Sequence, residues 1–171
     1  MGYITESRRD NGFFGNFSIA QNMAVSLSLK HGGYKGAMGL FHEENERKTA
    51  EAQRKLLALK CHSVDQSITE LSGGNQQKVL ISKWLCCNPD VIIFDEPTRG
   101  IDVGAKAEIY KVMRQLADDG KVILMVSSEL PEIIAVCDRI AVFCEGRLTQ
   151  ILTNRDDMSE EEIMVWALPQ E

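Results

Sequence analysis

The stretch from residue 71 to residue 102, LSGGNQQKVLISKWLCCNPDVIIFDEPTRGID, places four elements in a fixed order. A small-residue loop opens an apolar helix, and the apolar run DVIIFDE that follows ends in Asp95 and Glu96. A short apolar run that ends in charge predicts a strand buried on both faces of a parallel sheet. Acids at the carboxyl end of such a strand lie at the edge of an α/β sheet where ligands usually bind. The stretch therefore favours an α/β fold with a ligand site beside these acids.

The first seventy residues are predicted to be mainly helical. GYIT is typical of the end of a strand, and the polar, glycine-containing loop ESRRDNGFFGNF follows it. Ser18 is a candidate cap for a helix that continues to about Leu29, before the glycine-rich break HGGYKGAMG. Residues 43–60 are rich in Glu, Lys, Ala and Leu at helical spacing, which predicts a second helix. We divide this part into residues 1–17, a strand end with its loop, and residues 18–70, a helical subdomain.

Strands and helices alternate after residue 70. Apolar spacing predicts an amphipathic helix over residues 105–116, which leads to the strand KVILMVSS and a short helix around ELPEIIAVC. RIAVFCEG and RLTQILT are predicted strands, and Ser159 with Glu162 three residues later forms a capping box for a last helix. This alternation favours an open α/β sheet within residues 71–171.

Composition narrows the class of function. The chain has 171 residues, 44% of them hydrophobic, which is enough for one domain with its own core. A formal net charge of −6 argues against nucleic acid as a partner, because surfaces that hold its phosphates carry an excess of Lys and Arg. No apolar run approaches the ~20 residues needed to cross a bilayer. The five cysteines form no CxxC pair, which predicts reduced thiols in a cytosolic setting.

Asp95 and Glu96 are the first candidate functional residues. A carboxylate at this sheet edge can hold a water of a Mg²⁺ shell, and a second can orient a nucleophilic water or accept its proton. Phosphoryl transfer to water needs both tasks. The alternative is structural: the acids end a strand, and a turn begins at Pro97.

The loop before the helix adds a second candidate element. Ser72, Gly73 and Gly74 offer a hydroxyl and unhindered amides at the positive end of a helix dipole, an arrangement that binds phosphate. On its own, Ser-Gly-Gly before a helix is more often a simple N-cap. Its position within about thirty residues of two acids at a strand end favours the phosphate interpretation.

LSGGNQQK followed by VIIFDEPTRGID closely resembles the signature motif, Walker B strand and D-loop of ABC-type ATPases. The likeness is strongest to the second nucleotide-binding half of bacterial sugar importers, and it covers essentially all 171 residues. It implies a partial ABC-type P-loop ATPase domain, α/β in class, with a RecA-like open sheet and a helical subdomain. It also implies ATP and Mg²⁺ as cofactors, because the family hydrolyses ATP to drive transport.

The same resemblance implies the partners and the place of work. ATP sites of the family form between two nucleotide-binding domains, so a second such domain is expected as a partner. Membrane-spanning permease subunits are expected to dock on the helical subdomain, residues 18–70, and a periplasmic sugar-binding protein would act indirectly. The expected location is cytoplasmic, peripheral on the inner membrane.

Each functional position follows from the motif that it matches. Ser72, Gly73 and Gly74 would cap the γ-phosphate of ATP held by the opposite domain. Asn75 stands where the family usually has the glutamine of LSGGQ, and both are amides with similar hydrogen-bonding ability.

The remaining positions come from the Walker B strand and the loops. Asp95 would support Mg²⁺ through water, and Glu96 would be the catalytic base. Asp102 would be the D-loop acid that couples the two sites. Glu6 lies about where the family has its Q-loop glutamine, and the alternative for it is a solvated loop acid.

Two departures from the pattern bear on activity. No stretch fits GxxxxGK[ST], the Walker A loop whose amides and lysine hold the β- and γ-phosphates, so we expect a truncated chain that is inactive alone. Ser128 in VSSEL stands where the family normally has a histidine that contacts the γ-phosphate. A serine cannot carry the positive charge that an imidazole acquires, which predicts slow hydrolysis at that site.

Two other functions remain as alternatives. The chain could be a non-catalytic interaction module that supplies its signature loop to a partner ATPase domain, an option that the missing Walker A loop and Ser128 favour. An ABC-type ATPase of DNA repair would keep the same motifs but would need coiled-coil insertions or a basic surface, and the sequence has neither.

Overall fold

A computed structural model describes residues 1–30 and 43–169 of the chain. The chain divides into two compact units, Met1–Val126 and Ser127–Glu171, and each is described by itself. The glycine-rich break predicted at residues 31–39 lies outside the described residues. Within the described part of the chain, no helix has the length and apolarity that a membrane crossing requires.

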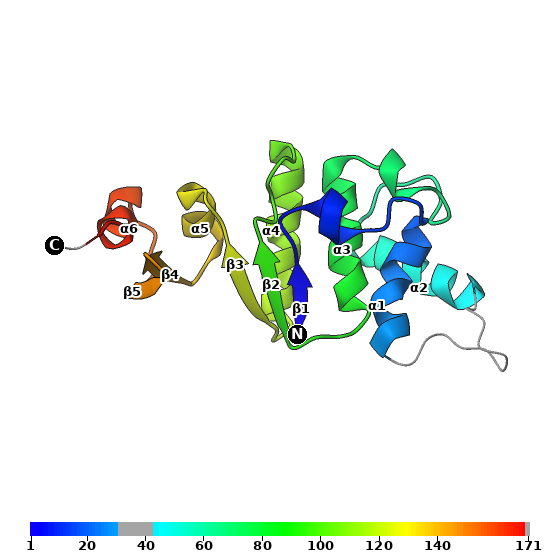
Figure 1. Ribbon diagram of the computed structural model, residues 1–171, viewed down its shortest axis with the longest axis horizontal. Helices are drawn as coiled ribbons and strands as arrows, with labels where there is room; N and C mark the ends of the chain where they lie inside the picture. The colour runs from blue at the N-terminus through cyan, green and yellow to red at the C-terminus, as the bar shows by residue number, and fades with distance from the viewer. Residues whose placement is uncertain (31–42, 170–171) are drawn as a thin grey trace. The chain divides into compact units, whose positions relative to one another are not determined.

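The first unit contains a three-stranded parallel sheet (Figure 1). Its strands are β1 (Gly2–Ile4), β2 (Val91–Asp95) and β3 (Val122–Val126), in that spatial order. β2 is central because it pairs with both neighbours, and its last residue, Asp95, lies opposite Val126. All three carboxyl ends therefore meet at one edge of the sheet, as the predicted ligand edge requires.

The burial of this sheet differs from the prediction for residues 91–95. Ile92 and Phe94 are fully buried, whereas the alternate residues of β2 are only half-buried. On β3, Val122, Leu124 and Val126 are 54%, 51% and 54% exposed. The prediction of burial on both faces is wrong for the described residues, because only one of the two alternating sets of side chains is covered.

Helices α3 (Gly73–Leu85) and α4 (Val103–Asp118) contact this sheet, α3 at β1 and α4 at β3. α4 is the crossover between the parallel strands β2 and β3, and its buried stripe contains Ile109, Met113 and Leu116. The amphipathic helix predicted over residues 105–116 is thus confirmed, with two extra residues at each end.

The helical part of the unit is built from α1 (Ile19–Lys30) and α2 (Glu43–Leu56), which pack on each other and, through α1, on α3. Ser18 caps α1 as predicted: its hydroxyl accepts from the Gln21 amide at 3.2 Å, and Gln21 Oε1 accepts from the Ser18 amide at 2.9 Å. The buried residues of this core are Ile19, Ala20, Met23, Ala50, Leu59, Val64, Ile68, Leu71 and Val79.

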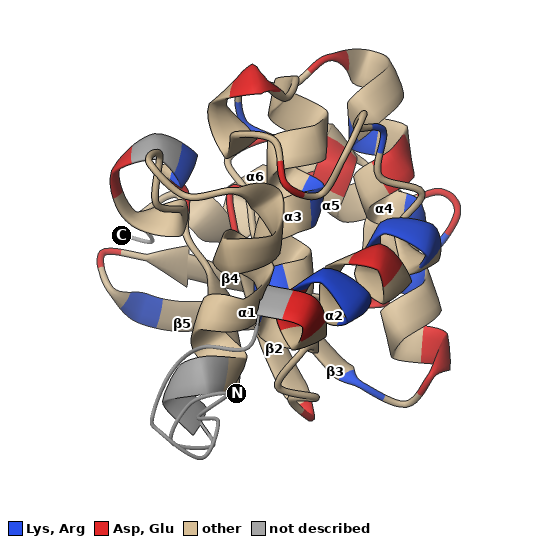
Figure 2. Cartoon of the chain, turned by 90° about the vertical axis from the view of Figure 1, so that its right-hand side faces the viewer, with Lys and Arg blue, Asp and Glu red and all other residues tan. Residues whose placement is uncertain are grey.

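α2 ends four residues before the predicted boundary at residue 60. Ala58 adopts a left-handed backbone with φ of 46°, and the Leu59 amide bonds to the Arg54 carbonyl at 2.9 Å. This is the Schellman ending of a helix, which usually has glycine in the left-handed position. Because alanine stands here instead of glycine, the sequence carries no signal for this helix end. Figure 2 shows acidic and basic segments alternating along α2 up to this point.

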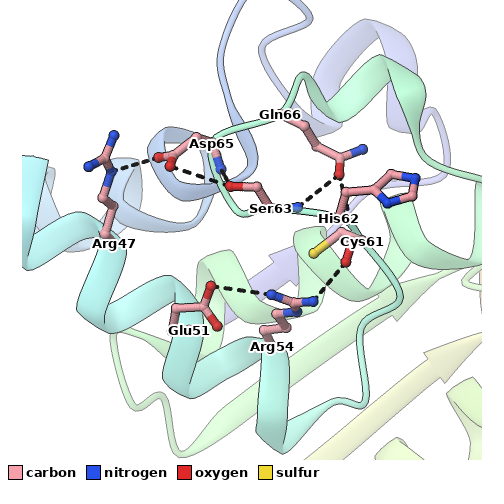
Figure 3. Close-up of polar contacts among 8 residues, drawn as sticks. All are labelled: Arg47, Glu51, Arg54, Cys61, His62, Ser63, Asp65 and Gln66. Atoms are coloured by element: carbon pink, nitrogen blue, oxygen red, sulfur yellow. Dashed lines mark hydrogen bonds and ion pairs between the residues drawn. The ribbon is translucent and has the colours of Figure 1, made fainter.

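The segment between α2 and α3 is held on α2 by polar contacts (Figure 3). Arg54 Nη2 donates to the Cys61 carbonyl at 2.7 Å, and Arg47 Nε donates to Asp65 Oδ1 at 2.8 Å. Gln66 Oε1 accepts from the amides of His62 and Ser63. A short 3₁₀ turn (Ile68–Glu70) then leads to α3, so the start of α3 is set by contacts with the helical part.

The second unit contains α5 (Leu130–Val136), β4 (Arg139–Cys144), β5 (Arg147–Thr153) and α6 (Glu160–Ala167). β4 and β5 pair with each other antiparallel instead of extending a parallel sheet, which corrects the open-sheet prediction for these strands. The cause is the Glu145-Gly146 turn: both residues have positive φ, 49° and 77°, the geometry of a two-residue hairpin. The predicted capping box of Ser159 and Glu162 is present at the start of α6.

Lys78 joins three elements of the first unit. Its side chain, on α3, is 4% exposed, and Nζ contacts Glu108 Oε2 of α4 at 2.8 Å. The same Nζ donates to the Ala58 carbonyl at the end of α2 at 3.1 Å. The hydrogen bond and charge of Lys78 lower the pKa of Glu108, with Lys60 adding a weaker attraction at 3.7 Å. A buried ammonium needs such partners, so the pair fixes α3 between the helical part and α4.

We expect Glu108→Gln to lower the free energy of unfolding by about 1 kcal/mol at pH 7, because a nearly buried Lys78 keeps a hydrogen bond but loses its charge partner. The folded-state pKa of Glu108 is depressed, so its contribution is present above the unfolded pKa and is lost as the pH falls through the folded one. In urea unfolding, the difference in the free energy of unfolding between this variant and the wild-type chain should become smaller below about pH 4. Glu44→Gln, whose partner Lys48 is exposed, should change little. Equal losses in both variants would contradict this role.

Candidate functional site

The two candidate acids lie where β2 leaves the sheet. Asp95 is its last residue, and Glu96 follows with φ of 46°, a left-handed backbone that is costly for a residue other than glycine. The Glu96 amide still bonds to the Val126 carbonyl of β3 at 2.9 Å, and the Glu96 carbonyl accepts from the Arg99 amide at 3.2 Å. The bend after Asp95 is thus held from both sides, and both acids are half-exposed.

Tyr3 is a neighbour of Asp95 that the sequence analysis did not identify. Its hydroxyl donates to Asp95 Oδ2 at 2.6 Å from the adjacent strand β1. This hydrogen bond is the main cause of a raised pKa for Tyr3, with burial and the charge of Asp95 adding to it. The contact depends on the pairing of β1 with β2, residues 90 positions apart, so local sequence patterns carry no signal for it.

Ser72 begins α3 but does not cap it through its side chain. Its hydroxyl instead accepts a hydrogen bond from Asn75 Nδ2 at 2.9 Å, and Asn75 Oδ1 accepts from the Lys60 amide at 2.9 Å. The Ser72 side chain is exposed. An anion at this helix start would therefore meet a hydroxyl already oriented by Asn75 and amides that the Ser72 side chain does not occupy.

The two glycines of the loop lie against the start of α4 and the turn before it. A Cβ added to Gly74 would lie 2.5 Å from Cβ of Ala105, closer than atoms can approach. A Cβ on Gly73 would lie 3.3 Å from Ile101 Cγ2 and 3.5 Å from the Gly100 carbonyl oxygen. The glycines thus permit close packing of α3 on α4, in addition to any contact with phosphate.

Asp102 and Glu6 both have structural partners. Asp102 is the N-cap of α4, and its Oδ1 accepts from the Ala105 amide at 2.9 Å. Glu6, between β1 and the helical turn Arg8–Gly12, forms an ion pair with Arg99, three residues after Glu96. The first unit therefore brings the residues around 72–75, the turn 98–102 and the loop at Glu6 together at one edge of the sheet.

Ser128 belongs to the second unit, between β3 and α5, and is exposed. Its neighbour Ser127 donates to Glu132 Oε2 at 3.2 Å and accepts from the Glu129 amide at 3.1 Å. These bonds hold the turn that carries Ser128 at the start of α5.

The donor set at the sheet edge fits a magnesium ion whose other ligands are water and phosphate oxygens. Among residues 1–30 and 43–169, no three His, Cys, Asp or Glu side chains gather at metal-binding distance. Mg²⁺ keeps several waters and is commonly bound through one or two carboxylates together with phosphate oxygens. The half-exposed Asp95 suits that role, through water rather than as part of a protein cage.

Comparison with known proteins gives one family match and many relatives. The family model for ABC transporters matches residues 1–99. The chain is 90% identical over its full length to the D-allose import ATP-binding protein of Escherichia coli, of which it covers 34%. It is 46% identical to the L-arabinose transport ATP-binding protein of Geobacillus stearothermophilus, over 96% of this chain and 31% of that protein. The chain spans about a third of the length of the curated relatives it matches.

Solved structures show the same fold. A dimeric bacterial ABC transporter cassette superposes with a TM-score of 0.72 at 26% identity, covering 91% of this chain and 63% of the cassette. A dimeric ATP-binding cassette bound to ADP and Pi superposes with a TM-score of 0.71 at 23% identity, covering 90% and 63%. These neighbours confirm the predicted ABC-type ATPase fold.

We expect Gly74→Ala to lower the free energy of unfolding by about 1–3 kcal/mol, because the new methyl group and Cβ of Ala105 are both fixed to the backbone and α3 must move away from α4. This loss exceeds the ~1 kcal/mol that alanine gains over glycine inside a helix. Gly104→Ala, at the second position of α4, is the matched control: its Cβ would lie 3.3 Å from Asp102 Oδ1, the end of a side chain that can shift, so the free energy of unfolding should change by less than about 1 kcal/mol. Urea unfolding of both variants measures the difference, and a more stable Gly74→Ala protein would refute the packing role.

Proposed function

Because the chain belongs to the ABC transporter family, we propose that it contributes the signature, Walker B and D-loop parts of an ATP-hydrolysing subunit that energises carbohydrate import, with D-allose as the sugar. The observation that carries the proposal is the junction of the signature residues with the Walker B side of the sheet. Gly74 packs on Ala105 of α4, whose cap Asp102 lies six residues after Glu96. The sugar follows from the 90% identity to a D-allose import protein.

In this proposal Asp95 and Glu96 share the work of phosphoryl transfer to water. Bound Mg²⁺ would neutralise charge that develops on the β- and γ-phosphates of ATP. Asp95 would hold a water of its shell, and Tyr3, by donating to Oδ2, would keep the carboxylate oriented for that contact. Glu96 would accept the proton of the attacking water, since a carboxylate within reach of that water can act as general base.

The signature residues would serve an ATP molecule held by a second nucleotide-binding domain. The Ser72 hydroxyl, oriented by Asn75, and the amides of Gly73 and Gly74 would bind the γ-phosphate at the positive end of α3. Asp102, beside Gly104 at the start of α4, would couple the two sites from the D-loop. Two domains would thus complete each other's sites.

The remaining assignments follow the same pattern. Residues 1–17 would be the strand and Q-loop region with Glu6, residues 18–70 the helical subdomain that meets the permease subunits, and residues 71–171 the rest of the nucleotide-binding domain. A periplasmic sugar-binding protein would act indirectly, and the subunit would work in the cytoplasm on the inner membrane. Ser128 in place of a histidine would leave the site of Asp95 and Glu96 slow.

A second candidate function is a non-catalytic module that supplies only its signature loop to a partner ATPase domain. The sequence lacks GxxxxGK[ST], the loop that would hold the phosphates of the chain's own ATP. Ser72, Gly73 and Gly74 of the signature, in contrast, are present, with Asn75 in place of the usual glutamine. The two candidates differ in whether Glu96 matters to turnover.

We expect the purified 171-residue chain not to bind Mg-ATP measurably up to millimolar concentration, because amides at one helix start hold phosphate weakly without a Walker A loop. Isothermal titration calorimetry measures this, after circular dichroism has shown that the chain is folded. Micromolar binding would mean that the chain has its own phosphate-holding loop, and the half-site proposal would be wrong.

Sugar import is tested with a chimeric subunit in which these 171 residues replace the matching segment of the Escherichia coli D-allose protein. We expect the chimera to restore uptake of labelled D-allose to cells that lack that subunit. Glu96→Gln, which keeps shape but cannot accept a proton, should remove the share of ATP turnover that this slow site contributes. Ser128→His should raise turnover.

The control in this experiment is Asp118→Asn, an exposed acid at the end of α4 that should leave uptake unchanged. A wild-type chimera that restores uptake while Glu96→Gln behaves normally would favour the non-catalytic module. A wild-type chimera that is expressed but restores no uptake would contradict the sugar assignment.

A further inference from the structure

Three segments that are distant in sequence meet at one guanidinium group. Arg8 Nη2 donates to the Gly100 carbonyl at 3.2 Å. A Cβ placed on Gly73 would lie 3.5 Å from the same nitrogen and 3.5 Å from that carbonyl oxygen. Arg8 thus lies between the signature loop and the turn 98–102, in contact with the turn and against the loop.

A second contact ties the same segment to the same turn. Glu6 forms an ion pair with Arg99, and both side chains are largely exposed, 46% and 67%. An exposed pair stabilises little and exchanges partners readily. The pair matters for geometry, because it holds the backbone just before Arg8 next to Arg99, the neighbour of Gly100.

The far end of the segment is anchored on α3. Lys83 Nζ donates to the Gly12 carbonyl at 2.9 Å, and burial lowers the pKa of Lys83. A Cβ on Gly12 would lie 2.6 Å from Leu80 Cδ2, so the backbone touches the helix there. Residues 6–12 therefore form a strap that begins on the turn 98–102 and ends on the second half of α3, at Leu80 and Lys83.

We propose that Arg8 is a positioning residue that, with the Glu6–Arg99 pair, locks the signature loop to the turn leading to Asp102. The planar guanidinium suits this task, because its several donors lie in one rigid fork. The strap makes residues 72–74 and 98–102 move as one body, so the groups that face the partner's ATP keep a fixed spacing from the acids of this chain. Glu6 acts in this lock as the partner of Arg99.

The role of this lock in ATP hydrolysis rests on the proposed function, but the lock itself is tested without nucleotide. Hydrogen exchange of the 171-residue chain reports on the Arg99 and Ile101 amides, which bond to the carbonyls of Glu96 and Thr98, and on the Gln76 amide, which bonds to the Ser72 carbonyl. We expect Arg8→Ala to speed exchange in both segments about tenfold, because the charge-assisted hydrogen bond to the Gly100 carbonyl and the guanidinium that lies against Gly73 are both lost. Arg114→Ala, which removes the same charge from the exposed side of α4, should leave both unchanged.

Faster exchange in only one segment after Arg8→Ala, or an equal effect of Arg114→Ala, would overturn the lock. Glu6→Arg and Arg99→Glu give a second measurement that does not depend on Arg8. Each alone should speed exchange of the Arg99 amide, and the pair together should restore it because the charges are exchanged. A double variant that exchanges faster than either single one would also overturn the proposal.

The chimeric subunit separates positioning from stability. There Arg8→Ala should lower kcat for ATP with KM changed less than about twofold, because a residue that acts on the turn at Gly100 and the loop at Gly73 affects the spacing of the site and not the binding of nucleotide. A raised KM at unchanged kcat would mean that Arg8 binds nucleotide and would overturn the positioning role. Loss of D-allose uptake by the wild-type chimera would instead count against the proposed function and leave the exchange results standing.

Discussion

The contact between Gly74 and Ala105 is the constraint on which the rest of the first unit depends. No side chain separates α3 from α4 at this point, since a Cβ on Gly74 would stand 2.5 Å from that of Ala105. Lys78, one turn later on α3, meets Glu108 on α4, so the two helices are held at their start by backbone proximity and further along by charge. The segment that connects α3 to α4, which includes β2 and the acids at its end, must therefore begin and end on two helices that contact each other. Residues 72–74 and the acids Asp95 and Glu96 therefore belong to a stretch of chain whose two flanking helices, α3 and α4, are held together.

The sequence predicted most of the fold where the signal is local. Apolar runs marked β2 and β3, helical spacing marked α4, and Ser18 and Ser159 marked the starts of their helices, because each of these patterns is decided within a few residues. Where the partner is distant the predictions failed or were silent. The pairing of β4 with β5 depended on a left-handed Glu145, a residue without the usual preference for that backbone. The exposed face of β3 depended on what covers the sheet, which no run of apolar residues encodes.

The candidate site shows the same division. Motif order identified Ser72, Asp95 and Glu96 as candidates, since the chemistry of phosphate and Mg²⁺ limits which residue types can stand there. Their supporting contacts come from elsewhere: Tyr3 reaches Asp95 through strand pairing, and Glu6 meets Arg99 across ninety residues. The residues that make these contacts lie in loops or at strand ends, where sequence patterns do not indicate a distant partner. A site can thus be located from its motif, whereas the groups that orient it are found only in the fold.

Asn75 illustrates why a mild substitution in a motif can still carry structural information. Its amide group is used at both ends, because Nδ2 donates to the Ser72 hydroxyl and Oδ1 accepts from the Lys60 amide. A serine that starts a helix normally turns its oxygen toward the helix amides, and here the bond from Asn75 replaces that cap. The helix thereby gives up some capping energy, which the link from Asn75 to residue 60 partly offsets by tying α3 to the end of α2. The surface is left with an oriented Ser72 hydroxyl beside helix amides that the Ser72 side chain does not cap. That combination suits an anion better than a capped helix would.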